Sequence, residues 1–378
     1  MRFLLDDEQS DFARSLDALL TAADTPAAVR SWSAGDPAAG RALWSRIADL
    51  GVFALAVPEE YEGLGPRPVE LAVAFVELGR HAVPGPLVET VTSASLLTGP
   101  GLANLAKRFL PGVASGETVA TVALPGGGPY VLDGDAADVE FVVGEGPGAV
   151  AVSDADAVSD ADAVSEAGAV ELWVSAPMAS PRVRHSPRVR RSIDPARRLA
   201  LPRAGGELLG TGPRIAAGAA DALRWARLAT AAQALGVGLA LLDRTVAYVK
   251  QRSQFGVPVG SFQAVRHRLA DAKIALEFAR PLVFGAAVSM DPADVAAAKV
   301  AACEAAYATA RTALQLHGAI GYTAEYDLSL WLTKARALRS AWGSPGECRA
   351  EVLGHGDGFG RLPRVPRDDL SGGGLRCS

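Results

Sequence analysis

Cysteine is scarce in this chain of 378 residues, and its three cysteines, Cys303, Cys348 and Cys377, lie far apart. None belongs to a Cys-x-x-Cys pair, and an odd number of cysteines does not build a disulfide framework. The scarcity argues against a disulfide-stapled secreted domain and against a zinc site built from cysteine pairs. The sequence therefore predicts a reduced, intracellular protein of the cytoplasm.

Long apolar runs are also missing. No uninterrupted stretch of about 18 apolar residues occurs, so we expect no membrane span. The first apolar run, at the N-terminus, is short and is followed at once by acidic residues, which is not typical of a signal peptide. Neither sign of charge dominates, since the net charge is -5 and the densest basic cluster, 181–191, is interrupted by proline and serine. We therefore expect no nucleic-acid partner.

What the chain does have is enough apolar content, 49%, to form sizeable cores. Its length predicts two or three domains, at about 150 residues for each. Residues 1–112 carry helical periodicity, with the clearest stretches at 4–23, 38–50 and 67–82. The sequence therefore predicts an N-terminal helical domain over 1–112.

The middle of the chain, residues 113–205, has a different character. Short valine-rich runs broken by glycine predict β-strands, and hence a β-barrel-like domain. Within it, the hexapeptide Val-Ser-Asp-Ala-Asp-Ala occurs twice, at 152–163. A calcium loop needs a turn glycine and a final glutamate that this repeat lacks, so we expect a solvated loop and no metal site. The four aspartates concerned are Asp154, Asp156, Asp160 and Asp162.

Strong helical periodicity returns after about residue 213. A heptad-spaced apolar stripe predicts one long helix, and further helices are expected over 265–276 and from Asp291 to about 318. Aspartate suits the N-cap and the proline that follows suits the first turn. The residues of the stripe are Leu228, Leu235, Leu242 and Val249. Residues 206–365 are thus predicted to form a four-helix bundle, and the fold is mainly α with a small β domain. The Asp/Gly/Ser-rich segment 366–378 is predicted to be a disordered tail.

Two segments of the predicted bundle contain candidate binding residues. In the first, 251–271, Arg252 ends a long helix, where a guanidinium could pair with a phosphate. On composition alone, the favoured explanation is a surface arginine near a helix C-terminus, where positive charge suits the helix dipole. The second segment, 314–337, reads Gln-Leu-His-Gly-Ala-Ile-Gly-Tyr from Gln315. We expect His317 to be packed or hydrogen-bonded rather than to act in acid–base chemistry.

Together these segments resemble the two flavin-contacting signatures of the acyl-CoA dehydrogenase family. The first matches Arg-x-Gln-Phe-Gly-x-Pro and continues to Leu-Ala-Asp at 269–271, and the second matches at its glutamine, glycines, tyrosine and glutamate. Weaker agreement occurs at 56–65, 77–90 and 194–197. The resemblance covers nearly the whole chain and is strongest in its final third.

The resemblance implies an FAD cofactor that is shared between subunits of a dimer or tetramer, made of identical or different chains. In the family, the arginine contacts the FAD pyrophosphate across the subunit boundary, and glycines let the backbone approach the nucleotide. It also implies an acyl-CoA or acyl-carrier thioester as substrate and an electron-transfer protein as acceptor. The residues expected at the cofactor are Arg252, Gln254, Phe255, Gln263, Gln315, Gly318, Ala319 (a departure from the family's glycine) and Ser344.

The chain departs from the family at the catalytic base. There, a glutamate removes the α-proton of the thioester while a hydride leaves the β-carbon for the flavin. An ungapped reading places Trp342 at the usual position of that glutamate and Ala226 at its alternative position. Neither side chain can remove a proton from carbon, so Glu347 is the nearest candidate. Trp173 is present in the β domain, but the family's threonine- and serine-rich strand that covers the flavin ring is not recognisable.

Three hypotheses follow from the resemblance. The chain is a dehydrogenase that oxidises an acyl thioester at the α,β bond with an unusual base. Alternatively, it is a non-catalytic subunit that completes the FAD site of a heteromeric acyl-CoA dehydrogenase. A third hypothesis is a relative of the acyl-CoA oxidases or flavin monooxygenases.

Overall fold

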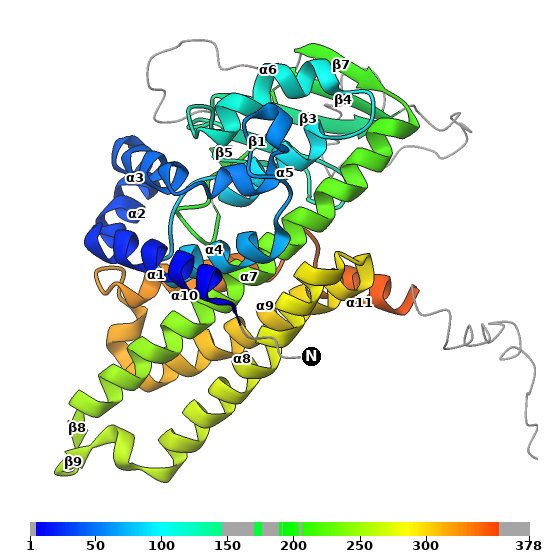
Figure 1. The fold of residues 1–378 in the computed structure, drawn as a ribbon. Helices are drawn as coiled ribbons and strands as arrows, with labels where there is room; N and C mark the ends of the chain where they lie inside the picture. Colours follow the sequence, from blue (N-terminus) through cyan, green and yellow to red (C-terminus); the bar gives the residue numbers. More distant parts are fainter. Residues whose placement is uncertain (1–4, 146–169, 176–188, 191, 204–205, 355–378) are drawn as a thin grey trace, which may run out of the picture.

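The computed structural model describes residues 5–145, 170–175, 189–190, 192–203 and 206–354. A helical N-terminal region, a small β region and a bundle of long helices follow one another along the chain (Figure 1). This arrangement agrees with the expected fold class, mainly α with a small β domain. The predicted tail, 366–378, and the duplicated hexapeptide at 152–163 lie outside the described residues.

The N-terminal region consists of six helices and two 3-10 turns. The side chains of Asp6 and Gln9 cap the first helix reciprocally, because each bonds the other residue's backbone N–H. The second helix, which the sequence analysis did not predict, begins at the carboxylate of Asp24, which accepts from the N–H of Ala27. The elements are α1 (Asp7–Ala22), α2 (Thr25–Ser33), α3 (Ala38–Asp49), η1 (Phe53–Ala56), η2 (Glu59–Tyr61), α4 (Pro68–Arg80), α5 (Leu87–Leu97) and α6 (Ala103–Ala114).

The β region forms two small sheets among the described residues. The first has the order β1-β3-β4-β7, in which β1 and β3 are parallel and the other pairs antiparallel; the second has the order β2-β6-β5. Its strands reach Thr211, six residues beyond the predicted boundary at 205, because β7 pairs with β4. The strands are β1 (Ala120–Ala123), β2 (Val131–Leu132), β3 (Val139–Glu145), β4 (Val170–Ser175), β5 (Val189–Arg190), β6 (Leu199–Ala200) and β7 (Glu207–Thr211).

The C-terminal region is built around α7, a helix of 39 residues that is about 58 Å long. The predicted start of α9 is confirmed, since the Asp291 carboxylate accepts from the N–H of Ala293 at 2.9 Å and of Asp294 at 3.3 Å. The elements are α7 (Pro213–Gln251), β8 (Ser253–Gln254), β9 (Val257–Pro258), η3 (Val259–Ser261), α8 (Gln263–Ser289), α9 (Pro292–His317), η4 (Gly318–Tyr322), α10 (Leu328–Leu338) and α11 (Pro345–Gly354).

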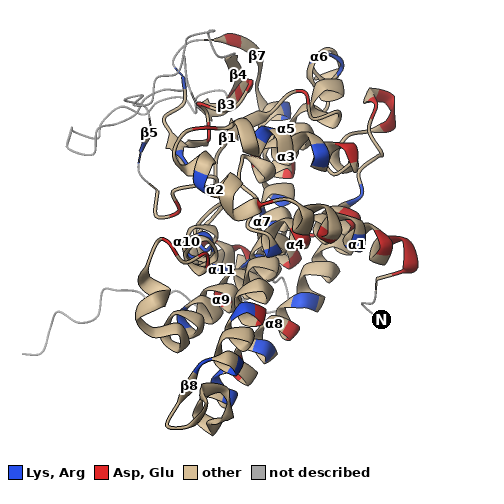
Figure 2. Cartoon of the chain, turned by 90° about the vertical axis from the view of Figure 1, so that its left-hand side faces the viewer, with Lys and Arg blue, Asp and Glu red and all other residues tan. Residues whose placement is uncertain are grey.

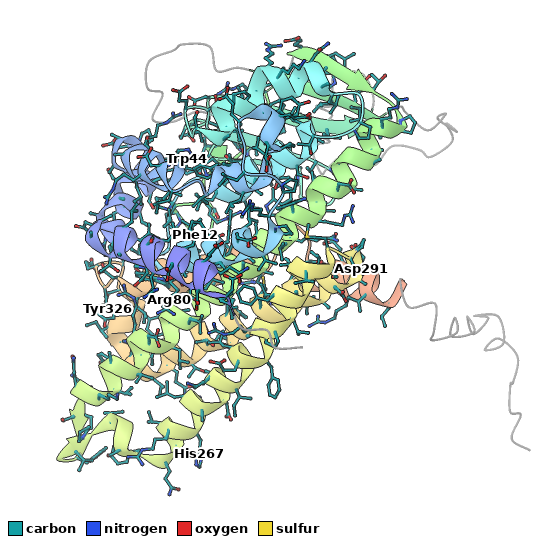
Figure 3. All side chains as sticks on the ribbon, in the orientation of Figure 1. Phe12, Trp44, Arg80, His267, Asp291 and Tyr326 are labelled. Carbon is teal, nitrogen blue, oxygen red and sulfur yellow. The ribbon has the colours of Figure 1, made fainter. Side chains whose placement is uncertain are left out.

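Helix α7 joins the three regions. It begins directly after β7 and ends at the β8–β9 hairpin, so the β sheets and the hairpin lie at opposite ends of the molecule (Figure 1). His267 on α8 lies near the hairpin end, and Asp291 lies toward the other end of the bundle (Figure 3). Glycines let α4 pack closely on α7, since a Cβ at Gly79 would overlap the carbonyl of Gln233 and one at Gly236 that of Val76.

Among the described helices, α7 is the one long and apolar enough to cross a membrane, but 94% of its most apolar stretch is buried inside the protein. It is therefore the core helix of the fold. The predicted absence of a membrane span agrees with this burial.

Candidate flavin site and reaction centre

The two candidate segments meet at the hairpin end of the bundle. The ring of Tyr248, near the end of α7, stacks on the ring of His317, at the end of α9, with their centroids 4.1 Å apart. The Tyr248 hydroxyl donates to the backbone carbonyl of His317 at 3.3 Å. Arg268 on α8 bonds the side chain of Gln315. Segments some 60 residues apart in sequence thus form one continuous surface.

The predicted cofactor residues of the first segment all lie on this surface and are exposed: Arg252, Gln254, Phe255 and Gln263. The guanidinium of Arg252 has no hydrogen-bond or ion-pair partner within the part of the chain that the structure describes. The Phe255 ring is 92% exposed, and its backbone has a positive φ of 54°. An exposed aromatic ring beside an arginine without an internal partner suits an external phosphate-bearing group.

The second segment contributes Gln315, Gly318 and Ala319 at the end of α9. Gly318 has a φ of +66°, which glycine adopts without strain, and no atom lies within 4 Å of where a Cβ would stand. Open space therefore lies over this turn, and Ala319 is exposed beside it. These residues fit a nucleotide that approaches the backbone from outside the chain.

His317 is a packed histidine, as expected. Its Nδ1 lies 2.8 Å from the carbonyl oxygen of Ala313, so Nδ1 carries the proton and donates, and Nε2 is buried without a partner in the described part of the chain. Burial lowers the pKa of His317, and the neutral ring stacks on Tyr248. Its role is to join the ends of α7 and α9.

The surface is positively charged. Residues 250–273 include five lysines and arginines and a single acidic residue, Asp271. Lysine and arginine colour follows α8 and the chain near β8 (Figure 2). Because α7 separates this end from the chain's own β region by about 58 Å, an FAD pyrophosphate held here would have its flavin ring in another subunit. The geometry thus agrees with a site shared between chains.

The two positions where a family base is expected, 226 and 342, are linked through the residue that follows Ala226. Arg227 lies on α7 directly after Ala226, and its Nε donates to the backbone carbonyl of Trp342 at 3.1 Å. Ala226 is fully buried and Trp342 is 4% exposed. Two sequence positions that are 116 residues apart thus mark one place, which we call the reaction centre.

A buried carboxylate that the sequence analysis missed lies at the reaction centre. Glu89 on α5 is 3% exposed and lies beside the side chain of Trp342. Burial raises the pKa of Glu89, and Arg197, at 3.6 Å, opposes that shift. Its Oε2 has no hydrogen-bond partner within the described residues. The available signal was a charged residue inside Leu87–Leu97, a helix whose residues are all buried.

More buried charges surround Glu89. Lys334 lies 3.6 Å from Asp194, both almost fully buried, and burial lowers the pKa of Lys334. Burial likewise raises the pKa of Asp133 to about 7, although Arg198 opposes the shift. Buried charges of this kind persist where each has a partner of opposite sign. Among the described residues, they tie α5, α10 and the strands of the small sheet together.

The structure gives Glu347 a different part from the proposed base. Its carboxylate accepts from the N–H of Ser344 at 2.6 Å, while the Ser344 hydroxyl accepts from the N–H of Glu347 at 3.2 Å. This reciprocal pair caps α11. Glu347 is exposed, and the bond from Ser344 lowers the pKa of its carboxyl, which is the opposite of what a base for a weakly acidic carbon needs. Trp173 is likewise engaged locally, since its Nε1 donates to Glu171 at 2.9 Å.

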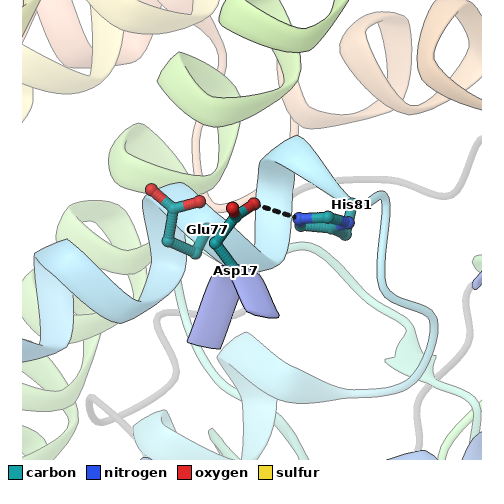
Figure 4. Close-up of side chains that lie close together, drawn as sticks. All are labelled: Asp17, Glu77 and His81. Atoms are coloured by element: carbon teal, nitrogen blue, oxygen red, sulfur yellow. Dashed lines mark hydrogen bonds and ion pairs between the residues drawn. The ribbon is translucent and has the colours of Figure 1, made fainter. Parts of the chain in front are cut away.

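A separate polar cluster joins α1 to α4. Asp17, Glu77 and His81 bring their ligand atoms within 4.8 Å of one another (Figure 4). The Nε2 of His81 lies 2.8 Å from the Asp17 carboxylate, and burial raises the pKa of Glu77 to about 7. The guanidinium of Arg80, 3.6 Å from Glu77, already provides a positive charge beside the carboxylates, so the cluster needs no metal ion to balance them. These side chains link α1 to α4.

The fold, the exposed two-segment surface and the reaction centre define a class of flavoprotein oxidoreductase. Family models described as "Acyl-CoA dehydrogenase, N-terminal domain" and "Acyl-CoA dehydrogenase, C-terminal domain" match residues 6–117 and 216–351. Acyl-CoA dehydrogenase IpdE2 of Mycobacterium tuberculosis (strain ATCC 25618 / H37Rv) is 32% identical over 324 residues, which cover 85% of this chain and 89% of that protein. The chain belongs to the acyl-CoA dehydrogenase family, whose members use FAD and act on CH–CH bonds.

Solved structures show the same fold. The glutaryl-coenzyme A dehydrogenase complex with glutaryl-CoA has a TM-score of 0.74 at 23% identity and covers 93% of this chain and 96% of that one. The ChsE4–ChsE5 complex from Mycobacterium tuberculosis has a TM-score of 0.71 at 24% identity and covers 94% of this chain and 98% of that one. The expected fold class is therefore confirmed.

Proposed function

We propose that this chain takes part in the α,β-oxidation of an acyl thioester, with hydride transfer to an FAD that it holds together with another subunit. One observation supports this most: two flavin-type segments converge on an exposed, positively charged surface about 58 Å from the chain's own β region. An arginine without an internal partner and an open glycine turn are what such a shared nucleotide site needs.

The proposal assigns a part to each cofactor residue. Arg252 holds the pyrophosphate, because its planar guanidinium offers two parallel donors to phosphate oxygens. Gln254, Phe255 and Gln263 follow the adenosine, with the Phe255 ring as an apolar platform. The turn after α9 completes the nucleotide contacts; its residues are Gln315, Gly318 and Ala319. When bound, FAD accepts the hydride from the β-carbon of the substrate.

Ser344 lies apart from these residues, at the loop between α10 and α11. Its hydroxyl and N–H are both used in capping α11. An FAD contact of Ser344 would therefore be made near the reaction centre, with the flavin end of the cofactor. The pyrophosphate of that FAD would be held by Arg252 of another chain. We therefore propose that each chain contacts two FAD molecules, one at each of these places.

The partners follow from the same chemistry. The substrate is an acyl-CoA or an acyl-carrier thioester, and the reduced flavin passes its electrons to an acceptor protein. The assembly is a dimer or tetramer. We propose the cytoplasm as its location, in keeping with two buried cysteines, Cys303 and Cys348, that carry free thiols.

A second candidate function is a subunit that completes the FAD site of a heteromer. The specific observation for it is the reaction centre, where the side chain of Trp342 is buried at the position expected for the base. The named relatives favour the first candidate, since they are called acyl-CoA dehydrogenases. One solved structure of this fold, the ChsE4–ChsE5 complex, contains two named chains.

The test is the visible spectrum and FAD stoichiometry of the purified chain, followed by titration with a panel of saturated acyl-CoAs. About one FAD for each chain, bleached by an acyl-CoA, supports the first candidate. FAD that binds but is not bleached, or that binds only when a second family chain is present, supports the second. A chain that binds no FAD under either condition overturns both. Rapid reoxidation of the reduced flavin by oxygen would instead favour an oxidase.

A further inference from the structure

The side chain of Trp342 occupies the reaction centre. The proposed reaction needs the α-carbon of the thioester beside the residue that removes its proton, and positions 226 and 342 both lie here because Arg227 binds the carbonyl of Trp342. An indole at this place is larger than a carboxylate and has no basic atom. With 4% of its surface exposed, it leaves the reacting carbons no access to position 342.

The ring is enclosed by two elements from other parts of the chain. One face lies on the backbone of Gly127, in the loop between β1 and β2, where an added Cβ would come within 2.5 Å of the ring carbon Cζ3. The indole lies beside Glu89 on α5. The absence of a side chain at Gly127 is therefore what makes room for the ring. The two positions fit each other as a pair.

The backbone around Trp342 is held as firmly as the ring. Arg227 binds the carbonyl of Trp342, and the Nζ of Lys299, a fully buried lysine, binds that of Gly343. Trp342 has a φ of +58°, which is uncommon for a residue with a large side chain and persists only where the surroundings impose it. The loop is thus fixed by two buried cations and does not depend on the ring alone.

Glu89 gives a reason for tryptophan at this position in particular. Its carboxyl group is buried, its Oε1 lies 3.6 Å from Arg197, and its Oε2 has no hydrogen-bond partner within the described residues. An indole beside this group brings an N–H, the only polar atom of the ring. Phenylalanine has no N–H and, because its ring is smaller, would fill less of the space.

We infer that the buried ring of Trp342, packed on Gly127 and beside Glu89, closes the acyl-thioester site of this chain. This inference rests on the proposed function and refines its second candidate: the chain supplies nucleotide contacts at its hairpin end, and the proton is removed in a subunit that carries a carboxylate at the equivalent position. Within this chain, the reaction centre is a packed core.

The first experiment measures acyl-CoA binding to the FAD-loaded full-length protein by calorimetry, with butyryl-CoA and octanoyl-CoA as probes. Trp342→Gly removes the ring and suits the positive φ, whereas Trp342→Phe keeps a smaller aromatic ring and is the control. We expect no measurable binding by the unchanged protein, and at least tenfold tighter binding by Trp342→Gly than by Trp342→Phe. Trp342→Leu serves in its place if circular dichroism shows that the glycine variant does not fold.

The second experiment restores a carboxylate. In the double variant Trp342→Glu with Glu89→Gln, the new glutamate replaces the ring, and the change at residue 89 avoids two adjacent buried carboxylates. The glutamate would take the α-proton while the hydride leaves the β-carbon and reduces FAD to its two-electron form, giving an enoyl thioester. We expect octanoyl-CoA to bleach the flavin of this variant and not that of the unchanged protein.

The closure is overturned if the unchanged protein binds either acyl-CoA as tightly as Trp342→Gly, or if its flavin is bleached. Those results would leave FAD binding intact, so they differ from failure of the proposed function, in which no variant retains FAD. Failure of both open variants to bind acyl-CoA while FAD stays bound would also overturn the inference, because removing the ring should then have opened the site.

Discussion

The two ends of the flavin chemistry in this chain are built in opposite ways. At the hairpin end, Arg252, Gln254 and Phe255 are exposed, and the guanidinium has no partner among the described residues. At the reaction centre, Trp342 and the charged side chains of Glu89 and Lys299 are buried, and Lys299 binds two backbone carbonyls. The first region presents its polar side chains to solvent, and the second encloses them. The exposed region can therefore bind a group from outside the chain, whereas the enclosed region has to rearrange its side chains first.

The largest effect should follow from removing the exposed arginine. Arg252→Ala is expected to weaken FAD binding by about 100-fold, since a charge-assisted bond to phosphate contributes roughly 1.5 to 3 kcal/mol. The melting temperature of the flavin-free protein should not change, because Arg252 holds no other group in the described part of the chain. Equilibrium dialysis against FAD measures the affinity. Arg14→Ala, an exposed arginine on α1, is the control, and equal FAD retention by both variants would refute the pyrophosphate role.

A buried residue should show the reverse behaviour. Lys299→Met is expected to lower the free energy of unfolding by about 2 to 3 kcal/mol, because the carbonyls of Gly343 and Arg339 lose their buried donor. FAD affinity of the folded fraction should stay within a factor of two or three. Urea unfolding followed by circular dichroism measures the change. If Lys299→Met lowered FAD affinity but left the free energy of unfolding unchanged, the reaction centre would behave like the exposed hairpin end, and the comparison between the two regions would be wrong.

The cluster between α1 and α4 gives a pH-dependent prediction. Burial raises the pKa of Glu77 from 4.5 in the unfolded chain to about 7 in the folded protein, so folding favours the protonated form. Its contribution to stability is fully present below pH 4.5 and is lost as the pH rises through 7. The charged neighbours that modify this shift are Arg80, Asp17 and Arg280, and His81 lies beside them.

Glu77→Gln should therefore flatten the pH dependence of the free energy of unfolding between pH 4.5 and 7, by about 1 to 2 kcal/mol after allowance for solvent screening. Glu8→Gln, which changes an exposed residue of α1 itself, should leave this pH dependence unchanged. If the Glu77→Gln profile keeps the slope of the unchanged protein, the carboxyl group does not titrate in this range.

The smallest effect concerns Glu347. Glu347→Gln is expected to cost only about 0.5 kcal/mol of stability, because glutamine can keep both bonds of the capping pair with Ser344 and loses only the charge near the helix N-terminus. Any flavin bleaching by acyl-CoA should persist unchanged in this variant. Loss of bleaching with FAD still bound would show that Glu347 acts as the base. The proton would then be removed beside the buried reaction centre.

Local signals in the sequence were sufficient for the long elements. The heptad stripe predicted α7, and Asp291 with the proline after it predicted the start of α9, because capping and periodicity depend on neighbouring residues. Helix α2 was missed, since its nine residues are too few for a clear period. The last strand, β7, was assigned to the bundle because its pairing with β4 depends on a residue pattern some 35 positions away.

The same distinction applies to the site. The hairpin residues follow a motif with fixed spacing and could be named from sequence. Glu89 could not, because its meaning comes from Trp342, 253 residues away, and from Arg197. The capping role of Glu347 was within reach of sequence reasoning, since Ser344 stands three residues before it and a proline lies between them.

The length of α7 has a consequence for how the protein behaves in solution. A helix of about 58 Å keeps the two ends of one chain from touching the same FAD, so the proposed sharing of FAD would link cofactor binding thermodynamically to the association of chains. Flavin retention should then depend on protein concentration: dilution below the dissociation constant of the assembly releases FAD, and added FAD draws dilute chains back together.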